Sequence, residues 1–380
     1  MLGRRFGWQP SAGDTAQPLN YADAMLRTLI EVVYPQELGK IGLRGDTAPL
    51  SWERSIQPTN VTREPGGDRH RFELGFEQGA LVEWKPIRDE QLWSCERNYT
   101  MLAGESLTVA PYFHRATGVL DGGALTLASP ELGGDVHFRI FLPPSYEEHR
   151  TKRYPVLYAH DAQALFAAAP DPGDPHSWRM DTALNELYDY GVIEELIVVA
   201  VTTKERRIEM LTPTADAVYG GGGGDRYLEF LVKTLKPQID ATLRTRTDPD
   251  STAMIGASLG GLFSFYAAWM RSDIWGRAAC LSPSFWWNER RAIHRVQECC
   301  PVPRPWLYLD SGAALSQFEQ DANVRDGFQH TQAMAKALLA NCYEPGKDLV
   351  ALTYAGFQHD ASAWAARLAI PLQLLFPRRG

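Results

Sequence analysis

The spacing of apolar and polar positions changes partway along the chain. Between Lys40 and Phe113, short apolar runs are broken by turn-forming residues, and the clearest turn spans Arg63 to Asp68. Such runs are typical of short antiparallel strands, so this stretch predicts a small all-β sandwich domain. Residues 21–34 fit either the start of a helix or a strand. The candidate strands are KIGLRG, RFELGF, ALVEWKPI and SLTVAPY.

After residue 120, short apolar runs alternate with amphipathic segments, of which residues 226–239 and 330–342 are the clearest. Apolar runs separated by helices predict a mainly parallel sheet that is covered on both faces. We therefore expect a loose tail over residues 1–20, a β-sandwich over 21–115 and an α/β domain over 120–380. The strand-like runs are VHFRIFLP, VLYAH, LIVVAV, TAMIG, RAACLS, WLYLD and LVALTY.

Composition and charge exclude several classes of protein. The chain has 380 residues, of which 44% are apolar and 22% charged, so a large core is available and disorder is excluded as the dominant state. A net charge of -8 argues against nucleic acid as a partner, because neutralising phosphates needs clustered Lys and Arg. The longest apolar runs are too short to span a bilayer, so we expect no membrane partner.

The cysteines and the first residues bear on the compartment. The chain begins with two arginines but no apolar segment behind them, which indicates no secretory signal. An odd number of cysteines without framework spacing predicts reduced thiols in a cytoplasmic protein. A secreted chain trimmed of its signal would have the same sequence. The cysteines are Cys95, Cys280, Cys299, Cys300 and Cys342.

No cofactor is expected from the remaining motifs. Cys299 and Cys300 are adjacent and lack the CxxC spacing or histidine companions of a zinc site, so we predict no metal. The five glycines from Gly220 to Gly224 resemble a flexible loop. They lack the spacing and the lysine of a nucleotide-binding P-loop.

The most informative segment runs from Ser251 to Met270. A short apolar strand leads into Gly256-Ala257-Ser258-Leu259-Gly260, and a long apolar helix follows. GxSxG between a strand and a helix is typical of a nucleophile elbow, where small flanking residues permit a sharp turn that exposes the serine. The alternative is that Ser258 only caps a tight turn. The strand before and the helix after favour the nucleophile.

A serine nucleophile needs a base, an acid and an oxyanion hole. His359 follows the last strand-like run, where this chain order places the base, although a solvated loop histidine is the alternative. The backbone amides of Leu259 and Ala162 are the candidate oxyanion donors. The acid should follow the run WLYLD, and we favour Asp326 with Asp321 second, although any one carboxylate can be a solvated loop residue or a helix cap. The candidate acids are Asp310, Glu319, Asp321 and Asp326.

Several of these motifs resemble the putative-esterase group of α/β-hydrolases over Asp135 to Pro377. The motifs are RYPVLYAHDAQALF, IGASLGGLFSFYAA, LSPSFWW and GFQHDASAWAARL. That group includes enterochelin (siderophore trilactone) esterases, esterase-D-like enzymes, feruloyl and acetylxylan carbohydrate esterases, and mycolyltransferases. SPSFWW and RRIEM are most similar to the enterochelin-esterase type.

The resemblance implies an α/β-hydrolase fold and ester hydrolysis through an acyl-serine, with Ser258 and His359 matching the nucleophile and base. The sequence departs from the family at the acid, because the expected position holds Leu315. A later carboxylate then substitutes, or the site works nearly as a dyad. Arg206 matches an arginine directed at an acidic or catecholate substrate, with an ordinary surface arginine as the alternative. Trp286 is expected to line the pocket.

The N-terminal region resembles starch-binding-type carbohydrate-binding modules through IGLRGDTAPLSW and ALVEWKPIRDEQLWSCERN. Trp52, Trp84 and Trp93 are its aromatic candidates. Sugar binding needs exposed indoles, whereas a small sandwich needs core tryptophans. We favour the core, with the domain walling one side of the esterase pocket.

These observations predict a serine carboxylic-ester hydrolase that acts on a small-molecule ester and most resembles an enterochelin-type esterase. A carbohydrate esterase acting on feruloyl or acetyl sugar esters is one alternative, and an acyltransferase is another. The non-enzymatic alternative is a ligand-binding protein with a vestigial site. An intact GxSxG turn followed by His359 argues against that alternative.

Overall fold

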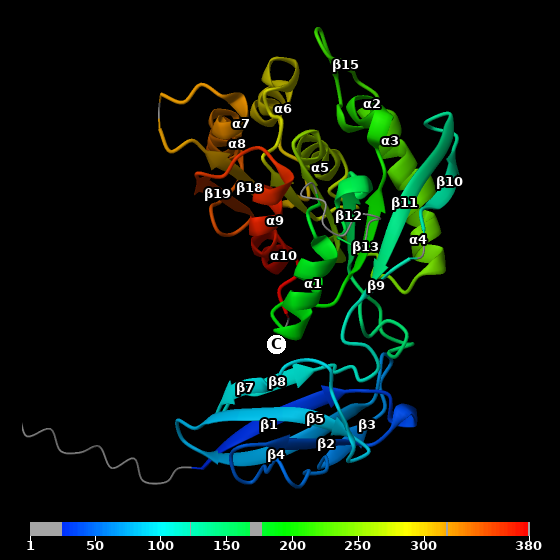
Figure 1. The fold of residues 1–380 in the computed structure, drawn as a ribbon, viewed down its shortest axis with the longest axis vertical. Helices are drawn as coiled ribbons and strands as arrows, with labels where there is room; N and C mark the ends of the chain where they lie inside the picture. Colours follow the sequence, from blue (N-terminus) through cyan, green and yellow to red (C-terminus); the bar gives the residue numbers. More distant parts are fainter. Residues whose placement is uncertain (1–24, 122, 168–176, 317, 379–380) are drawn as a thin grey trace, which may run out of the picture.

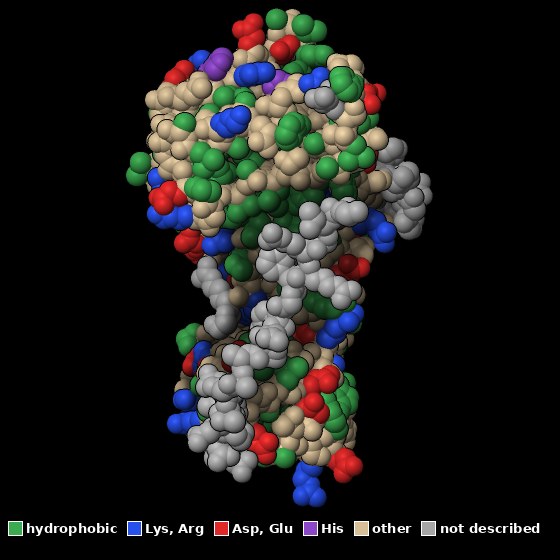
Figure 2. Space-filling model, turned by 90° about the vertical axis from the view of Figure 1, so that its left-hand side faces the viewer, with side chains coloured by type: hydrophobic (Ala, Val, Ile, Leu, Met, Phe, Trp, Pro, Cys, Tyr) green, Lys and Arg blue, Asp and Glu red, His purple; other side chains and the backbone are tan. Residues whose placement is uncertain are grey.

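The computed structural model describes residues 25–121, 123–167, 177–316 and 318–378. A β-sheet part holds the first strands, and an α/β part holds the rest of the described chain (Figure 1). Figure 2 shows the same two parts from the side, joined by a narrower region. The expected loose tail over residues 1–20 lies outside the described residues.

The N-terminal part is a sandwich of two sheets. Residues 21–34, which fitted a helix or a strand, contribute β1 (Met25–Val33), whose side chains alternate between buried and partly exposed positions. Apolar side chains of both sheets form one core, which includes Ile30, Phe72 and Trp84. One sheet has the order β3 (Asn60–Thr62), β4 (Arg69–Glu77), β1, β8 (Ser106–Val109); the other contains β2 (Ile41–Gly45), β5 (Leu81–Arg88), β6 (Leu92–Trp93) and β7 (Tyr99–Leu102).

The three tryptophans of the sandwich do not share one environment. Trp84 is fully buried, as predicted for a core residue. Trp52 and Trp93 are each 37% exposed, with ring centroids 6.0 Å apart, so the core prediction is wrong for both. The reason is positional. Trp93 lies on a two-residue strand with both side chains exposed, and Trp52 lies outside the strands.

The α/β part is built on one mixed sheet. The first strands pair antiparallel, and every neighbouring pair from β13 to β19 is parallel, which confirms the predicted mainly parallel sheet. β9 (Val119–Leu120) pairs with β11 beside this path. The strand order is β10 (Leu125–Ser129), β11 (Gly134–Leu142), β13 (Ile197–Val201), β12 (Val156–His160), β16 (Thr252–Ala257), β17 (Arg277–Leu281), β18 (Trp306–Ala313), β19 (Leu349–Ala355).

Helices cover both faces of this sheet. Within β12, Tyr158 belongs to the core that contains α5 and α8, whereas Leu157 belongs to the core that contains α1 and α10. Period-two alternation therefore supplies both cores from one apolar run. The α-helices are α1 (Met180–Asp189), α2 (Arg207–Leu211), α3 (Gly224–Phe230), α4 (Lys236–Thr242), α5 (Leu259–Met270), α6 (Trp287–Glu298), α7 (Ala322–Arg325), α8 (Phe328–Asn341), α9 (Ala361–Arg367) and α10 (Ala369–Leu375).

Shorter elements fill the connections. The glycine run that predicted a loop contains β15, which pairs with β14 in a small hairpin. Among the described residues, no helix combines the length and apolarity needed to cross a membrane. The short elements are β14 (Ala215–Asp216), β15 (Gly220–Gly221), η1 (Gln36–Leu38), η2 (Ala162–Ala164), η3 (Lys204–Arg206), η4 (Leu231–Leu235) and η5 (Pro249–Ser251).

The cysteines correct one expectation. Cys300 and Cys342 form a disulfide with their Cα atoms 6.5 Å apart, so the prediction of reduced thiols is wrong for this pair. Packing of α6 against α8 brings together two residues that lie 42 positions apart in the sequence. That Cα separation lies within the range a disulfide can bridge. Cys95, Cys280 and Cys299 are free thiols.

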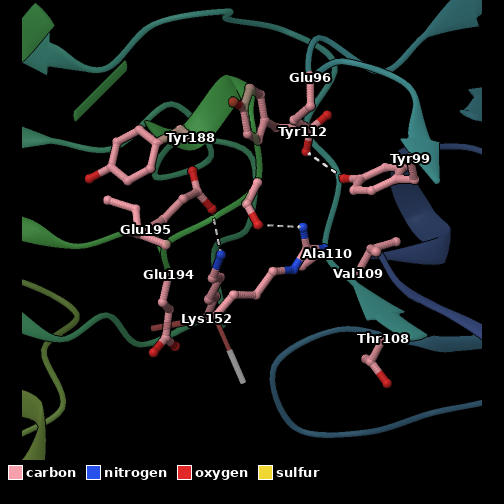
Figure 3. Close-up of a pocket in the computed structure, with 13 residues that line it drawn as sticks. Glu96, Tyr99, Thr108, Val109, Ala110, Tyr112, Lys152, Tyr188, Glu194 and Glu195 are labelled. Atoms are coloured by element: carbon pink, nitrogen blue, oxygen red, sulfur yellow. Dashed lines mark hydrogen bonds and ion pairs between the residues drawn. The ribbon is translucent and has the colours of Figure 1, made fainter. Parts of the chain in front are cut away.

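The two parts meet around a small pocket of about 210 Å³, which several ionisable side chains line (Figure 3). From the sandwich side, Glu96 accepts a hydrogen bond from the Tyr99 hydroxyl at 3.3 Å. From the α/β side, Lys152 and Glu195 form an ion pair at 2.5 Å. Glu96 and Glu195 are both buried, so ionisable groups from both parts are enclosed where the parts meet.

Candidate active site

The GxSxG segment forms a sharp turn between β16 and α5. Ser258 adopts φ 58° and ψ -121°, a conformation that L-residues rarely occupy, directly before the helix. A Cβ at Gly256 would lie 2.4 Å from the backbone carbonyl of Gly260, so only glycine fits there. Hydrogen bonds hold the turn in place, because Ser258 N donates to Leu281 O and Ser284 N donates to Ser258 O, both at 3.0 Å.

Three side chains that the sequence singled out lie in one hydrogen-bonded chain. His359 Nε2 is 2.9 Å from Ser258 Oγ, and His359 Nδ1 is 2.5 Å from Asp326 Oδ1. His359 lies between β19 and α9, and Asp326 lies between α7 and α8 with a positive φ of 48°. Asp321, the second candidate acid, is exposed. The arrangement allows a proton to move from the serine hydroxyl to the imidazole.

Asp326 is fully buried and its second oxygen is also occupied. Asp326 Oδ2 accepts hydrogen bonds from the Ser282 hydroxyl, at 2.5 Å, and from the Gly312 amide. The carboxylate that contacts His359 therefore lies in the loop before α8 and not at the family position that holds Leu315, which is 84% exposed. The sequence analysis gave Ser282 and Gly312 no role in the site. Ser282 directly follows β17 and Gly312 lies near the end of β18, and these two strands neighbour each other in the sheet, a placement that only the topology reveals.

Asp310 is occupied by a different partner. The Arg367 guanidinium pairs with both Asp310 oxygens at 3.1 Å, and the Tyr308 hydroxyl donates to Oδ2 at 2.8 Å. Burial raises the pKa of Asp310, and Arg367 opposes this rise. Asp310 is thus committed to a buried ion pair, which the sequence analysis did not anticipate.

The two candidate oxyanion donors differ in their surroundings. Leu259 begins α5, so its amide lies in the first turn of the helix, where amides lack partners within the helix. Ala162 begins η2 two residues after the end of β12, and β12 neighbours β16, the strand that leads to Ser258. Ala162 borders a separate hollow of about 440 Å³, which it shares with Gln163 and Lys204.

Ser258 and His359 open into a cleft of about 440 Å³. Trp286 lines this cleft and is 38% exposed, whereas Trp287 is buried and donates its indole N–H to Thr214 O at 2.7 Å. The two indoles are thus divided between pocket and core. Other residues that line the cleft include Tyr219, Ser282, Arg325, Gln329 and His330.

All residues that line this cleft lie between Tyr219 and His359 in the sequence. The expectation that the β-sandwich walls the pocket is therefore wrong for the described residues. The reason is the position of the sandwich, which contacts the α/β part around Glu96 and Glu195 instead (Figure 3).

Arg206 is not among the residues that line the cleft. Its guanidinium donates to Leu132 O at 3.0 Å and lies 3.4 Å from Glu209. Its neighbour Arg207 turns towards the loop after β12 instead, where it pairs with Asp161 at 3.0 Å. The side chains of two consecutive residues on a helix point about 100° apart, which is why these two arginines have different partners.

A family model described as "Putative esterase" matches residues 129–373, which is more than half of the chain. The chain is 28% identical over 173 residues to the uncharacterized protein YbbA of Bacillus subtilis, covering 44% of this chain and 64% of that protein. It is 28% identical over 161 residues to the siderophore triacetylfusarinine C esterase of Aspergillus fumigatus, covering 41% and 53%. The matches thus span less than two thirds of either relative.

A solved structure extends the similarity of fold to nearly the whole chain. The enterobactin esterase FES from Shigella flexneri, in the presence of enterobactin, aligns with a TM-score of 0.53 and 14% identity. The alignment covers 94% of this chain and 94% of that one. At this identity the similarity describes the fold, and it includes the N-terminal sandwich as well as the α/β part.

Proposed function

The chain belongs to the putative-esterase family, and from this membership we propose that it is a serine carboxylic-ester hydrolase that works through an acyl-serine intermediate. The observation that carries the proposal is the hydrogen-bonded chain from Ser258 through His359 to Asp326. Its two ends differ in access, because Ser258 and His359 line an open cleft whereas Asp326 is buried behind them. A reactive hydroxyl with a protected acid is what acyl transfer requires.

The proposed reaction begins when His359 Nε2 takes the Ser258 proton and Oγ forms a bond to the ester carbonyl carbon. The carbonyl electron pair moves to oxygen and gives a tetrahedral oxyanion. When this collapses, the bond to the alcohol oxygen breaks, and His359 returns its proton to the departing alcohol. Water then repeats the sequence on the acyl-serine and releases the acid. Asp326 accepts a hydrogen bond from Nδ1–H throughout without taking the proton, which keeps Nε2 directed at Ser258.

We assign the oxyanion hole to the amides of Leu259 and Ala162. Leu259 supports this best, since it begins a helix of 12 residues whose N-terminus favours developing negative charge. For Ala162 the support is its place at the carboxyl end of β12, next to the nucleophile strand. Each donor in such a site contributes about 10²- to 10³-fold to turnover.

The proposed substrate is a small siderophore-type ester. Similarity to a siderophore esterase of A. fumigatus supports this class. The cleft supports it by its chemistry, since Tyr219 and Trp286 offer aromatic faces for a flat acyl group. Arg325 lines the same cleft and can pair with an anionic group of the substrate.

The test is replacement of the proposed nucleophile. We expect Ser258→Ala to lower kcat for p-nitrophenyl butyrate and for a catecholate trilactone by about 10³-fold or more. The matched control is Ser264→Ala, a buried serine on α5, the helix that follows Ser258, whose hydroxyl donates to Gly260 O at 2.8 Å. A fluorophosphonate probe should label the wild type and Ser264→Ala but not Ser258→Ala. Hydrolysis and labelling that survive in Ser258→Ala refute the proposal.

A further inference from the structure

Ser282 lies at the centre of a buried polar cluster behind the base. Its Oγ is 2.5 Å from Asp326 Oδ2, 2.5 Å from Arg367 Nη2 and 3.0 Å from the Trp364 indole nitrogen. Guanidinium and indole N–H groups can only donate, whereas a hydroxyl has one proton and two lone pairs. The two donors occupy both lone pairs, so the single proton of Ser282 is directed to Asp326.

This direction fixes what Asp326 can do. Its Oδ2 receives the Ser282 proton and the Gly312 amide proton, which leaves no room for a proton of its own on that oxygen. The Arg367 cation 3.5 Å from the same oxygen favours the ionised carboxylate, so the geometry points to Asp326 as the acceptor and to Nδ1 of His359 as the atom that carries the hydrogen facing Oδ1. The Nε2 lone pair then points to Ser258 Oγ, as a general base requires.

The charge behind this network comes from one buried arginine. Arg367 has 1% of its side chain exposed and lies between two fully buried carboxylates, 3.1 Å from Asp310 and 3.5 Å from Asp326 Oδ2. Buried charges are costly unless they are paired. With both carboxylates ionised the cluster carries one excess negative charge. A proton that arrives on His359 cancels this charge.

We propose, on the basis of the proposed function, that Arg367 and Ser282 are positioning residues. Their guanidinium and hydroxyl groups hold Asp326 as an ionised hydrogen-bond acceptor for His359. Trp364 and Arg367 lie on α9, the helix that begins two residues after His359. The Trp364 ring packs edge-on against the imidazole at 5.1 Å. One short helix therefore orients both the base and the residue that holds the acid.

The titratable groups around Asp326 predict the direction of a pH effect. His359 and Arg367 face it directly, and Asp310 lies beyond Arg367. Tyr308 donates to Asp310 at 2.8 Å, and the Tyr354 hydroxyl is 3.1 Å from that of Tyr308. Removing the buried positive charge favours every protonated form in such a coupled cluster, so proton uptake begins at higher pH.

The experiment compares Ser282→Ala, Arg367→Met and Arg367→Lys in the full chain, with kcat and KM for p-nitrophenyl butyrate measured from pH 5 to 9. We expect kcat to fall about 10- to 100-fold in Ser282→Ala and Arg367→Met while KM changes less than about 2-fold. The acid limb of kcat/KM moves to higher pH in Arg367→Met, and Arg367→Lys, which keeps the charge, restores it towards the wild type.

A double-mutant cycle separates positioning from mere structural support. If Ser282 and Arg367 act through Asp326, adding Ser282→Ala to Asp326→Asn lowers kcat by less than about 3-fold further. A full, independent loss in both backgrounds overturns the inference. The matched control is Arg246→Met, which removes another guanidinium from a bidentate pair, with Glu194 at 2.8 Å, and should leave kcat and the acid limb unchanged.

Two further comparisons make the outcome decisive. Thermal melting of each variant shows whether it folds, and if Arg367→Met does not, Ser282→Ala and Arg367→Lys decide the question. Ser258→Ala is measured alongside. Undiminished hydrolysis there refutes the proposed nucleophile. The positioning role alone is refuted if Ser258→Ala loses activity while the folded Ser282 and Arg367 variants keep the wild-type kcat and the wild-type acid limb of kcat/KM.

Discussion

Glu96 is a buried acid at the junction of the two parts of the molecule, and its replacement by glutamine should stabilise the protein (Figure 3). Burial raises its pKa to about 8, and the nearby charge of Glu195 adds to the rise. The Tyr99 hydroxyl at 3.3 Å and backbone amides oppose the shift but do not cancel it. Glu96 Oε2 has no hydrogen-bond partner among the described residues.

The sign follows from proton linkage. A carboxyl group can have a higher pKa in the folded state than in the unfolded chain. Its contribution to stability is then fully present only at a pH below its pKa in the unfolded chain, which is near 4.5. That stability is lost as the pH rises through the folded value of about 8. The free energy of unfolding changes by at most about 1.4 kcal/mol per pH unit for one proton. Between pH 6 and pH 8 the wild type should therefore lose about 2 kcal/mol of this free energy through Glu96.

Glu96→Gln keeps the shape and removes the titration. We expect its melting temperature to exceed that of the wild type by a margin that widens by a few degrees from pH 6 to pH 8. A margin that stays constant over this range refutes the argument, because only ionisation of Glu96 produces the slope.

Glu195, in the same pocket, provides the matched control of opposite sign. Burial acts to raise its pKa, but Lys152 at 2.5 Å and Ser145 hold the pKa below its ordinary value. A carboxyl with a lowered pKa stabilises the fold above its unfolded value and loses this only at acid pH. Glu195→Gln should therefore cost about 3 kcal/mol by leaving Lys152 unpaired, and because Glu96 is retained, the stability of this variant should still fall between pH 6 and pH 8.

The remaining predictions concern the cleft. Asp326→Asn should lower kcat for p-nitrophenyl butyrate by about 10²- to 10⁴-fold, whereas Asp321→Asn, at an exposed position, should leave it unchanged. Equal losses in both variants would contradict the choice of acid. Trp286→Ala should raise KM for an aromatic ester about 10-fold with little change in kcat, because it removes one aromatic wall of the cleft. An unchanged KM would place the acyl group elsewhere.

Local patterns in the sequence predicted those parts of the site that are themselves local. The strand, the glycine-flanked turn at Ser258 and the following helix lie within about twenty residues, so spacing alone describes them. The alternation of apolar runs and amphipathic segments likewise predicted a mainly parallel sheet, because each run must be buried on two faces. Asp326 was chosen from four carboxylates only by its place before a helix.

What sequence reasoning missed depends on contacts between distant positions. Arg367 reaches Asp310 across 57 positions, and Ser282 reaches Asp326 across 44, so neither pair leaves a local signal. The disulfide between Cys300 and Cys342 has the same origin, because it requires the packing of α6 on α8. Composition and spacing show which residues are present in the chain. They do not show which of these residues the packing of helices on the sheet brings together at the carboxyl ends of the strands.

The placement of the sandwich makes the stability and kinetic experiments independent of each other. Figure 1 shows β15, α6 and α7, which lie beside or carry cleft residues, at the end of the α/β part away from the sandwich. Glu96 and Glu195 lie where the sandwich meets that part. Mutations more than about 10 Å apart without shared partners have additive effects. Glu96→Gln should therefore raise the melting temperature without changing kcat, whereas Ser282→Ala should lower kcat without altering the pH slope of stability. A change in kcat in Glu96→Gln would mean that the sandwich and the cleft are coupled through the sheet, and it would contradict the separation argued from the residues that line each pocket.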